Sequence, residues 1–408
     1  MKRALTFFNG ISLPERILWF LAFLCLGIGI WARFWHLDTI VTPIFDEVYF
    51  PVFAANFLRH GISFDVHPPL GKVLLSLGIA AFGDNSLGWR IIPALFGVLN
   101  IALFGALARQ IGLGRIGFLS VIALTALDGL LIVYSRVGLI DGLLLASILF
   151  TFYVAWLPPT RWTLFWLFTL IGLTVSIKWV GLGVVVPVGY LLLIRRKLVP
   201  LSLLWSYFVY EAVVTLGQVI GRVANPLKAG FTWNGLAAAY HLHLTATHPY
   251  ASSWWSWPLE LRPVLFYYQT VPGGTSVIAS LSNPLLWGAV DLAVIGSLLY
   301  LGIHYFRKTP LPLEHPLYPL LLGYFAFWLP WAMVHRVLFL YHYIPSYAFG
   351  LLLLSYWLNR LWKQNPWETL LAITVLSSGG VYFLPLAIGT PLSDLWLARH
   401  IWYKPWIY

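Results

Sequence analysis

Two adjacent carboxylates, Asp46 and Glu47, are the first candidates for chemistry, because they lie in the apolar and aromatic stretch 45–50. Ionisable side chains near membrane depth are costly and usually serve a function. Burial in such surroundings raises the basicity of a carboxylate, which suits a general base that takes a proton from a hydroxyl. The alternative is a surface loop whose acids point to water. We predict that Asp46 is the base and that Glu47 positions either Asp46 or a neighbouring cation.

A second ordered run covers residues 65–72 and contains His67, two prolines, Gly71 and Lys72. The prolines restrict the backbone, and Gly71 allows another group to approach closely. His67 and Lys72 supply hydrogen-bond donors. The run therefore predicts a rigid turn that holds a phosphate or a sugar. The alternative is a turn that only begins the next helix.

Several cations stand at the ends of apolar runs, where a charge needs a partner or access to water. The alternative to a functional role for Arg90 is that its side chain extends its charged end from this depth to the membrane surface. Arg136 could instead pair with Asp141. The four cations of this kind are Arg90, Arg136, Lys178 and Arg336. If they share one membrane face with Asp46, they would neutralise a leaving phosphate while the carboxylate deprotonates an acceptor. The candidate donor-site residues are His67, Lys72, Arg90, Arg136, Asp141, Lys178, Arg336, His342 and Tyr343.

A later stretch contains His241, His243 and His248, followed by Trp254 and Trp257. Histidines spaced by two can bind a metal, but no cysteine and few acids accompany them. We expect no metal and no required cofactor; a divalent ion held by the acidic pair and nearby histidines is the alternative. The tryptophans are candidates for the acceptor side, where they would stack on a ligand. The alternative is an aromatic belt at the membrane surface.

The composition shows which solvent surrounds these residues. Of 408 residues, 60% are hydrophobic and only 10% are charged, against about 25% charged in soluble domains. Lipid must therefore face most of the chain. The net charge of +11 comes from basic residues at the ends of apolar runs, a pattern of topology signals and lipid contact rather than nucleic-acid binding. The single cysteine, Cys25, excludes an intrachain disulfide.

The apolar runs predict an all-α integral membrane protein with about eleven spans, since a helical span needs about 20 residues. Short basic segments such as Arg195-Arg196-Lys197 favour an N-terminus inside the cell. The long segments 38–90 and 222–283 are then outer loops of one catalytic domain, 1–408, in the cell membrane. Residues 70–82 are too short to span and predict an interfacial helix. The predicted spans are 17–37, 91–109, 116–134, 139–157, 162–177, 179–194, 199–221, 284–306, 316–334, 338–358 and 367–388.

Taken together, the motifs resemble the protein O-mannosyltransferase family, which depends on dolichyl- or polyprenyl-phosphate mannose and belongs to the GT-C superfamily. The resemblance runs over most of the chain in unbroken order. The motifs that carry it include Phe45-Asp46-Glu47-Val48-Tyr49, His67-Pro68-Pro69-Leu70-Gly71-Lys72, Gly88-Trp89-Arg90, Leu127-Asp128-Gly129, Ser135-Arg136, Leu139-Ile140-Asp141, Lys178-Trp179-Val180-Gly181, Asn283-Pro284 and Phe339-Leu340-Tyr341-His342-Tyr343.

This resemblance implies a fold of about eleven helices with an inner N-terminus. It implies transfer of mannose from a polyprenyl-phosphate donor to Ser/Thr hydroxyls of exported proteins, with inversion and without a glycosyl-enzyme intermediate. The family's catalytic acid falls on Asp46, and its arginine at the start of the second span falls on Arg90. The partners implied are the lipid donor, an exported protein or glycan acceptor and membrane lipid, with no nucleic acid.

The chain departs from the eukaryotic pattern in its second outer loop, which is too short for a MIR domain and indicates a compact bacterial-type member. One alternative function is therefore transfer of another lipid-phosphate sugar, of the aminoarabinose type, to a lipid or glycan. A transporter is the alternative of a different class, but it would carry midplane charges in repeated halves. The most obvious acids inside the predicted spans are Glu211 and Asp291, which could pair with each other or mark the donor's path.

Overall fold

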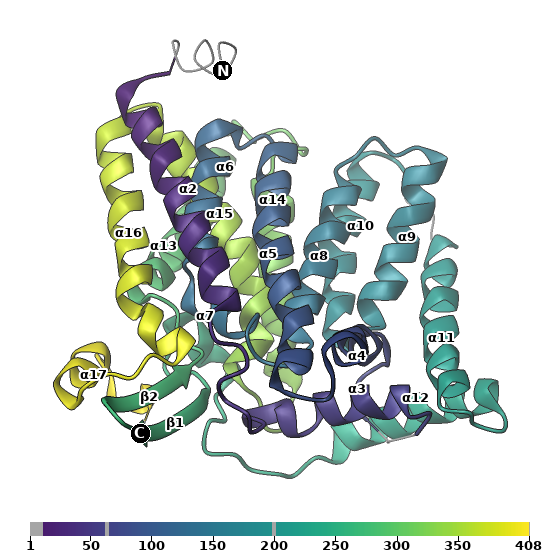
Figure 1. The fold of residues 1–408 in the computed structure, drawn as a ribbon. Coiled ribbons are helices and arrows are strands. Elements are labelled where there is room, and N and C mark those ends of the chain that lie inside the picture. The colour runs from purple at the N-terminus through teal and green to yellow at the C-terminus, as the bar shows by residue number, and fades with distance from the viewer. Residues whose placement is uncertain (1–10, 62–64, 198–200, 408) are drawn as a thin grey trace, which may run out of the picture.

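The computed structural model describes residues 11–61, 65–197 and 201–407. Most of the described chain is helical, and the long helices stand side by side as a bundle (Figure 1). A helix lies in each of the eleven predicted apolar runs. These helices are α2 (Leu13–Phe34), α5 (Ser86–Gln110), α6 (Gly114–Ala126), α8 (Asp141–Ala155), α9 (Arg161–Val175), α10 (Val185–Ile194), α11 (Ser202–Ile220), α13 (Pro284–Phe306), α14 (Leu317–Trp328), α15 (Ile344–Trp362) and α16 (Pro366–Ile388).

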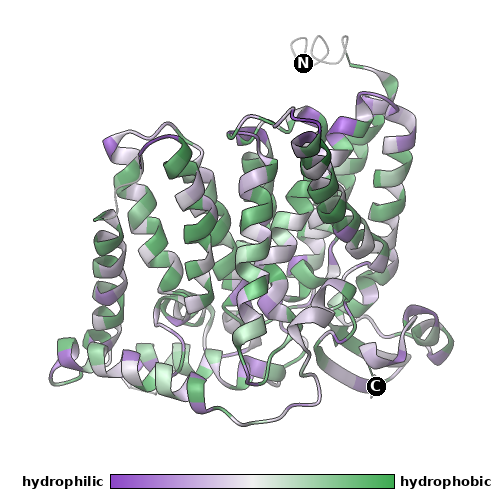
Figure 2. Ribbon diagram, turned by 180° about the vertical axis from the view of Figure 1, so that it is seen from behind, coloured by the Kyte–Doolittle hydropathy of each residue, from purple (hydrophilic) through white to green (hydrophobic). Residues whose placement is uncertain are grey.

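Five of the described helices are long and apolar enough to cross a membrane, namely α2, α5, α11, α13 and α16. They expose large apolar side chains outward, among them Phe20, Leu292 and Leu371. Figure 2 shows hydrophobic residues around the surfaces of the bundle helices. A soluble protein would keep a charged surface there, so this is an integral membrane protein.

The centre of the bundle is formed by α8 and α15, in which nearly every side chain is buried along the first three turns. A helix that is apolar on all sides belongs inside a protein. Helix α5 packs against α8, and α14 packs against α15. These contacts fix the ends of the helices at which the candidate site residues lie.

Side-chain caps set where several helices begin. Asn85 accepts a hydrogen bond from the backbone N of Gly88 (3.0 Å) at the start of α5. Asp128 caps the short helix α7 (Gly129–Val133) through the N of Leu131 (2.8 Å). Such caps satisfy backbone donors that a helix start leaves open. Because of the Asn85 cap, Arg90 lies just over one turn inside α5, facing the first long loop.

The two long loops fold over one end of the bundle (Figure 1). The first contains the 3-10 turn η1 (Phe45–Val48), α3 (Phe50–Leu58) and α4 (Leu70–Phe82). Helix α4 confirms the predicted short helix at 70–82. The second contains α12 (Pro226–His243) and the 3-10 turn η3 (Trp254–Leu259). The remaining short elements are η2 (Trp179–Val184), η4 (Leu329–Met333), η5 (Leu340–Tyr343), α17 (Asp394–His400) and η6 (Lys404–Trp406).

The all-α prediction is wrong in one place, because the second loop also contains a β-hairpin. Strand β1 (Leu265–Val271) pairs antiparallel with β2 (Gly274–Ala279), and a register shift lies between Leu265 and Tyr267. Gly273 and Gly274 take positive φ angles of 95° and 141° at the turn, which glycine adopts without strain. The aromatic and β-branched run before these glycines was the signal for a hairpin.

The two acids inside predicted spans have separate surroundings. Glu211 on α11 accepts a hydrogen bond from Nδ2 of Asn234 on α12 (2.8 Å). Asp291 lies on α13, a different helix. The alternative that these two acids pair with each other is therefore wrong, and Glu211 instead ties α12 to the bundle.

Candidate active site

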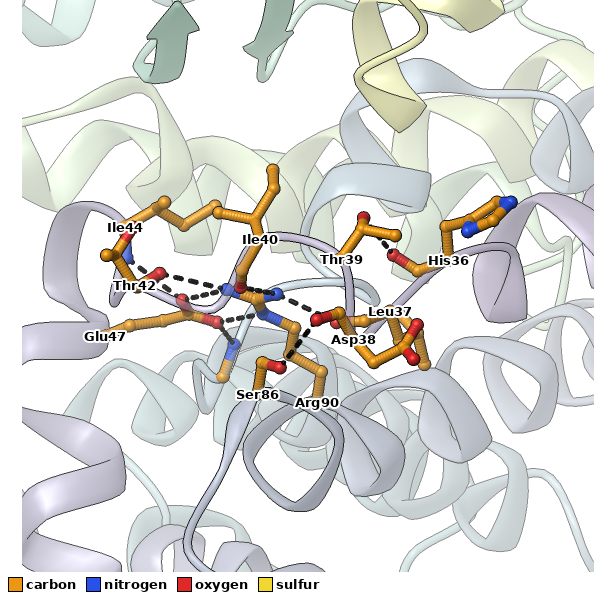
Figure 3. A network of polar contacts seen from close by, with 11 residues as sticks. His36, Leu37, Asp38, Thr39, Ile40, Thr42, Ile44, Glu47, Ser86 and Arg90 are labelled. Carbon is orange, nitrogen blue, oxygen red and sulfur yellow. Dashed lines mark hydrogen bonds and ion pairs between the residues drawn. The ribbon is translucent and has the colours of Figure 1, made fainter.

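The turn after α2 holds Glu47 in a fully buried position. Its Oε1 accepts from Arg90 Nε (2.8 Å) and from the backbone N of Gly138 (2.7 Å). Its Oε2 accepts from Arg90 Nη2 (2.7 Å) and from the N of Ile44 (3.0 Å). A Cβ atom at position 138 would lie 3.3 Å from Oε1, so glycine permits this close approach. Glu47 thus accepts four hydrogen bonds from three residues (Figure 3), which fix the turn that carries Asp46.

Arg90 uses all its N–H groups within this network. Besides its two bonds to Glu47, its Nη1 donates to the carbonyl oxygens of Leu37 and Ile40, both at 2.8 Å. Nη2 also points to the carbonyl of Thr42 at 3.5 Å. A guanidinium has five donors, so none remains for a ligand. In this structure Arg90 therefore holds the turn that carries Asp46, and its predicted contact with the donor phosphate stays a prediction.

Asp46 faces a cavity of about 320 Å³, here named the Asp46 cavity, which is also lined by His67, Lys178, Arg336 and His342. Within the described chain, its carboxylate accepts no hydrogen bond. Burial raises the pKa of Asp46 to about 6; the charge of Lys178 lowers it and the charge of Asp141 raises it. A carboxylate with a pKa close to neutral is suited to remove a proton at physiological pH.

Lys178 brings positive charge to this cavity from the turn before η2. Its Nζ donates to Asp141 Oδ1 at 2.9 Å and lies 4.7 Å from the ring centre of Tyr341. The Lys178 side chain is buried, so both contacts offset the loss of water around the ammonium. Asp141 therefore positions Lys178, and the remaining ammonium donors are available to a ligand.

Arg336 is the second cation of the Asp46 cavity and has fewer partners. It is half-buried, and its Nη1 donates to the carbonyl of Val337 at 3.2 Å. Arg336, Lys178 and His67 also line an adjoining space of about 460 Å³, here named the lateral groove. The outer part of that groove is apolar, with Leu242, Pro330, Met333 and Val334 in its wall. The cations of the Asp46 cavity therefore lie next to the apolar wall of the lateral groove.

Two histidines complete the cavity wall in neutral form. Burial and the charges of Lys178 and Arg336 lower the pKa of His67 and of His342 well below the ordinary value. The Nδ1 of His342 lies 2.9 Å from the carbonyl oxygen of Phe339. Neutral imidazoles can donate one hydrogen bond and accept another, so they can contact a sugar hydroxyl without adding charge. Among the described residues, no three His, Cys, Asp or Glu side chains are grouped as metal ligands.

Two family models match the chain in succession. The model of dolichyl-phosphate-mannose-protein mannosyltransferase matches residues 23–87 and 80–220, and the model of the C-terminal four TMM region of protein-O-mannosyltransferase matches residues 231–406. The chain belongs to the protein O-mannosyltransferase family. The polyprenol-phosphate-mannose–protein mannosyltransferase of Mycobacterium tuberculosis is 27% identical, covering 92% of this chain and 89% of that protein. The enzyme of the same name from Corynebacterium glutamicum is 24% identical, with 90% and 88% covered.

Solved structures show the same fold at low sequence identity. The Saccharomyces cerevisiae protein O-mannosyltransferase Pmt1–Pmt2 complex, bound to the sugar donor, matches with a TM-score of 0.79 at 15% identity, covering 98% of this chain and 93% of that chain. ArnT from Cupriavidus metallidurans, bound to undecaprenyl phosphate, matches with 0.59 at 15% identity, covering 90% and 76%. The chain therefore has the fold of these solved structures.

Lys72, a predicted donor-site residue, is occupied by partners within the protein. Lys72 is buried and bound to Asp65 and to the carbonyls of His67 and Pro68. It borders a different groove, between α4, α11 and α12, and not the Asp46 cavity. Lys72 thus stiffens the turn that presents His67, and the prediction that it grips the donor does not hold here.

The alternative that Arg136 pairs with Asp141 is wrong. Arg136 donates to the carbonyls of Ala32 and Trp35 at the end of α2, whereas Asp141 pairs with Lys178. Arg136 lines a separate pocket, described below, and not the Asp46 cavity. The short sequence separation suggested the pairing, but the turn between α7 and α8 points these two side chains apart.

Three aromatic candidates are structural rather than ligand-facing. Tyr343 is buried and its hydroxyl bonds to that of Tyr324 (2.5 Å). Trp257 is fully buried, donates to Ser252 Oγ (2.9 Å) and stacks on His342. Trp254 is half-buried and packs on Trp328. Trp257 therefore cannot contact an acceptor, and Trp254 lines neither the Asp46 cavity nor the lateral groove.

The structure adds cavity residues that sequence reasoning did not assign. Asp65, Tyr240, His241, Phe339 and Tyr341 all line the Asp46 cavity. Tyr341 lies in the motif around His342, and Asp65 begins the run that contains His67. These two motifs could therefore have pointed to both residues. Tyr240 and His241 end helix α12, and only the fold shows that α12 returns to the catalytic turn.

Proposed function

We propose that this chain transfers mannose from a polyprenyl-phosphate carrier to Ser/Thr hydroxyls of exported proteins, with inversion at the anomeric carbon. The observation that carries the proposal is the Asp46 cavity, where a carboxylate with a pKa of about 6 faces Lys178 and Arg336. The adjoining lateral groove has an apolar wall. A lipid phosphate needs this combination of cations next to an apolar surface. The names of the bacterial relatives supply the sugar and the acceptor class.

The reaction follows from these positions. Asp46 takes the proton of the acceptor hydroxyl as its oxygen attacks the anomeric carbon, and the bond from that carbon to the phosphate oxygen breaks. The electron pair leaves with the polyprenyl phosphate, whose growing charge is stabilised by Lys178 and Arg336. His67 and His342 orient the sugar. Glu47 and Arg90 keep Asp46 in place, and the isoprenoid chain leaves along the apolar wall of the lateral groove.

We place the chain in the cell membrane as a single catalytic domain with eleven spans, the N-terminus inside and the Asp46 end outside. The start of α2 and the C-terminal helix α17 lie at opposite ends of the bundle (Figure 1), which supports an odd number of spans. Basic residues such as Arg195 and Arg109 lie at helix ends remote from Asp46, in agreement with the positive-inside rule. A reporter fused after Tyr408 should be active outside the cytoplasm; activity inside would contradict the orientation.

The direct test is transfer by the purified full chain. It would be incubated with polyprenyl-phosphate mannose, with polyprenyl-phosphate aminoarabinose and with a Ser/Thr peptide, and products would be analysed by mass spectrometry. Mannosylated peptide is the expected product. Asp46→Asn should lower kcat by about 10²–10⁴-fold without weakening donor binding. Asp38→Asn is the matched control, because Asp38 is exposed in the same loop and should leave kcat unchanged. Transfer only from the aminoarabinose donor would overturn the sugar assignment.

A further inference from the structure

A second pocket lies on the other side of the catalytic turn, between residues 35–44 and the face of the β-hairpin. Its volume is about 470 Å³, and it is here named the hairpin pocket. The hairpin contributes Tyr267 and Val271 from β1 and Ile278 from β2, and the loop contributes Ile40 and Ile44. Nothing in the proposed reaction uses this space, since the donor occupies the Asp46 cavity and the lateral groove.

The charge around the hairpin pocket has one sign. Arg90 and Arg136 line it, and no Asp or Glu is among its described lining residues. Arg90 is neutralised by Glu47. Arg136 is 6% exposed, bonds only to backbone carbonyls, and its Nε has no hydrogen-bond partner in the described chain. A buried guanidinium without a carboxylate is electrostatically costly, and an anion in this pocket would offset the cost.

The hairpin pocket adjoins the catalytic turn directly. Its wall includes Ile44, whose backbone N donates to Glu47, and Arg90, the other partner of Glu47 (Figure 3). The ring of Phe45 packs on Phe266 of β1, with centroids 4.9 Å apart. The wall of this pocket at Ile44 therefore lies two residues of backbone from Asp46.

The hairpin itself offers a surface for an extended chain. The inner edge of β1 pairs with β2, and the far side of β2 is bridged at Thr275 by Leu392. In the described chain, no other strand pairs with the outer edge of β1. Extended peptides commonly bind by adding to such an edge. The pocket thus combines an apolar wall, a strand edge with which no further described strand pairs, and a cation without a carboxylate partner among the described residues.

We propose that the hairpin pocket binds the acceptor polypeptide beside the modified Ser/Thr and selects acceptors that carry a carboxylate about two to three residues away. This inference rests on the proposed function, because it assumes that the acceptor is a polypeptide. Arg136 supplies the attraction for the carboxylate, and the face of β1 with Tyr267 and Val271 carries the neighbouring residues. The acceptor hydroxyl then enters the Asp46 cavity from the side opposite to the lateral groove.

The test compares peptides that differ in one charge. The purified full chain would be assayed in lipid nanodiscs with peptides that contain one Ser or Thr acceptor. In each peptide, one of the three positions before or after this acceptor residue would carry Glu, Gln or Lys. For the wild type, we expect kcat/KM for the best Glu peptide to exceed that for its Lys counterpart by about tenfold or more. Val271→Asp places a carboxylate on the pocket wall, so it should abolish or reverse this preference. Val271→Asn is the matched control and should keep it, and the KM for the donor should stay unchanged in both.

Three results would overturn the proposal. Equal kcat/KM for Glu, Gln and Lys peptides in the wild type would show that no carboxylate is read. An equal loss for all peptides in Val271→Asp would show a structural role alone. If Val271→Asp instead changed the dependence of activity on anionic lipid in the nanodisc and left peptide preference intact, the occupant would be a lipid head group. Failure to mannosylate any peptide, with transfer to another acceptor, would instead mark failure of the proposed function.

Discussion

Replacing Arg90 separates positioning of the catalytic turn from binding of the donor. In Arg90→Gln, the fully buried Glu47 loses both of its bonds to the guanidinium, at 2.8 and 2.7 Å. The carbonyls of Leu37 and Ile40 lose their donors as well. Removing one partner of a buried ion pair costs about 3–5 kcal/mol. Since whole proteins are stable by only about 5–15 kcal/mol, we expect a marked loss of thermal stability and of kcat.

The assay would measure two quantities on the same detergent-solubilised sample. The half-life at elevated temperature reports stability, because unfolding of such proteins is often irreversible. The Kd for polyprenyl-phosphate mannose reports donor contact, and in the folded fraction it should stay within about twofold of wild type. A second change, Glu47→Gln in the same chain, should restore part of the half-life by removing the unpaired charge.

The refuting result for Arg90 is specific. A variant Arg90→Gln that kept its half-life but bound the donor more than about tenfold more weakly would mean that Arg90 contacts the phosphate. The network around Glu47 would then rearrange when the donor binds. Arg90→Lys provides a further check, because lysine keeps the charge but cannot make the two-pronged contact, and we expect it to lose stability as well.

The other predictions concern charge, pH and packing. Arg336→Gln should weaken donor binding by roughly 1.5–3 kcal/mol, whereas Arg59→Gln, at an exposed ion pair with Asp84, should not change the donor Kd. Because only ionised Asp46 accepts a proton and its pKa is about 6, kcat should be level above pH 7 and fall about tenfold per unit well below pH 6; a flat profile down to pH 5 would argue against this base. Trp257→Ala should cost about 3–5 kcal/mol of stability, measured as thermal half-life, and leave the acceptor KM unchanged in the folded fraction.

Much of the architecture was predictable because helices that face lipid must be apolar along their whole length. This constraint located a helix in every predicted run and the short helix α4 at its observed bounds, Leu70–Phe82. The hairpin was not predicted, since its aromatic run also fits a membrane belt. Burial of Trp257 was not predictable either, because whether a tryptophan faces a ligand or the core depends on which loop covers it.

The members of the site were easier to predict than their partners. Asp46, His67, Lys178, Arg336 and His342 do meet in one cavity. Their residue types and their positions at helix ends on one side were enough to bring them together.

Ion pairs across the fold could not be read from the sequence. Lys178 and Asp141 come from different helix ends, 37 positions apart, and Arg136 had seemed the nearer partner for Asp141. Local spacing is informative only within a helix or a strand pair. Between helices, the crossing geometry decides which charges meet.

The adjacent acids show how one dipeptide acquires two separate functions. The turn η1 directs Glu47 inward, where Arg90 and two backbone N–H groups occupy its oxygens. The same turn directs Asp46 into a cavity, where its carboxylate accepts no hydrogen bond from the described residues. The charge of Lys178 lowers the pKa of this carboxylate. A carboxylate that is fully hydrogen-bonded is a poor proton acceptor, and one left without partners is a better one. We therefore propose that Glu47 positions the turn and that Asp46 transfers the proton, although the two residues are adjacent in the sequence.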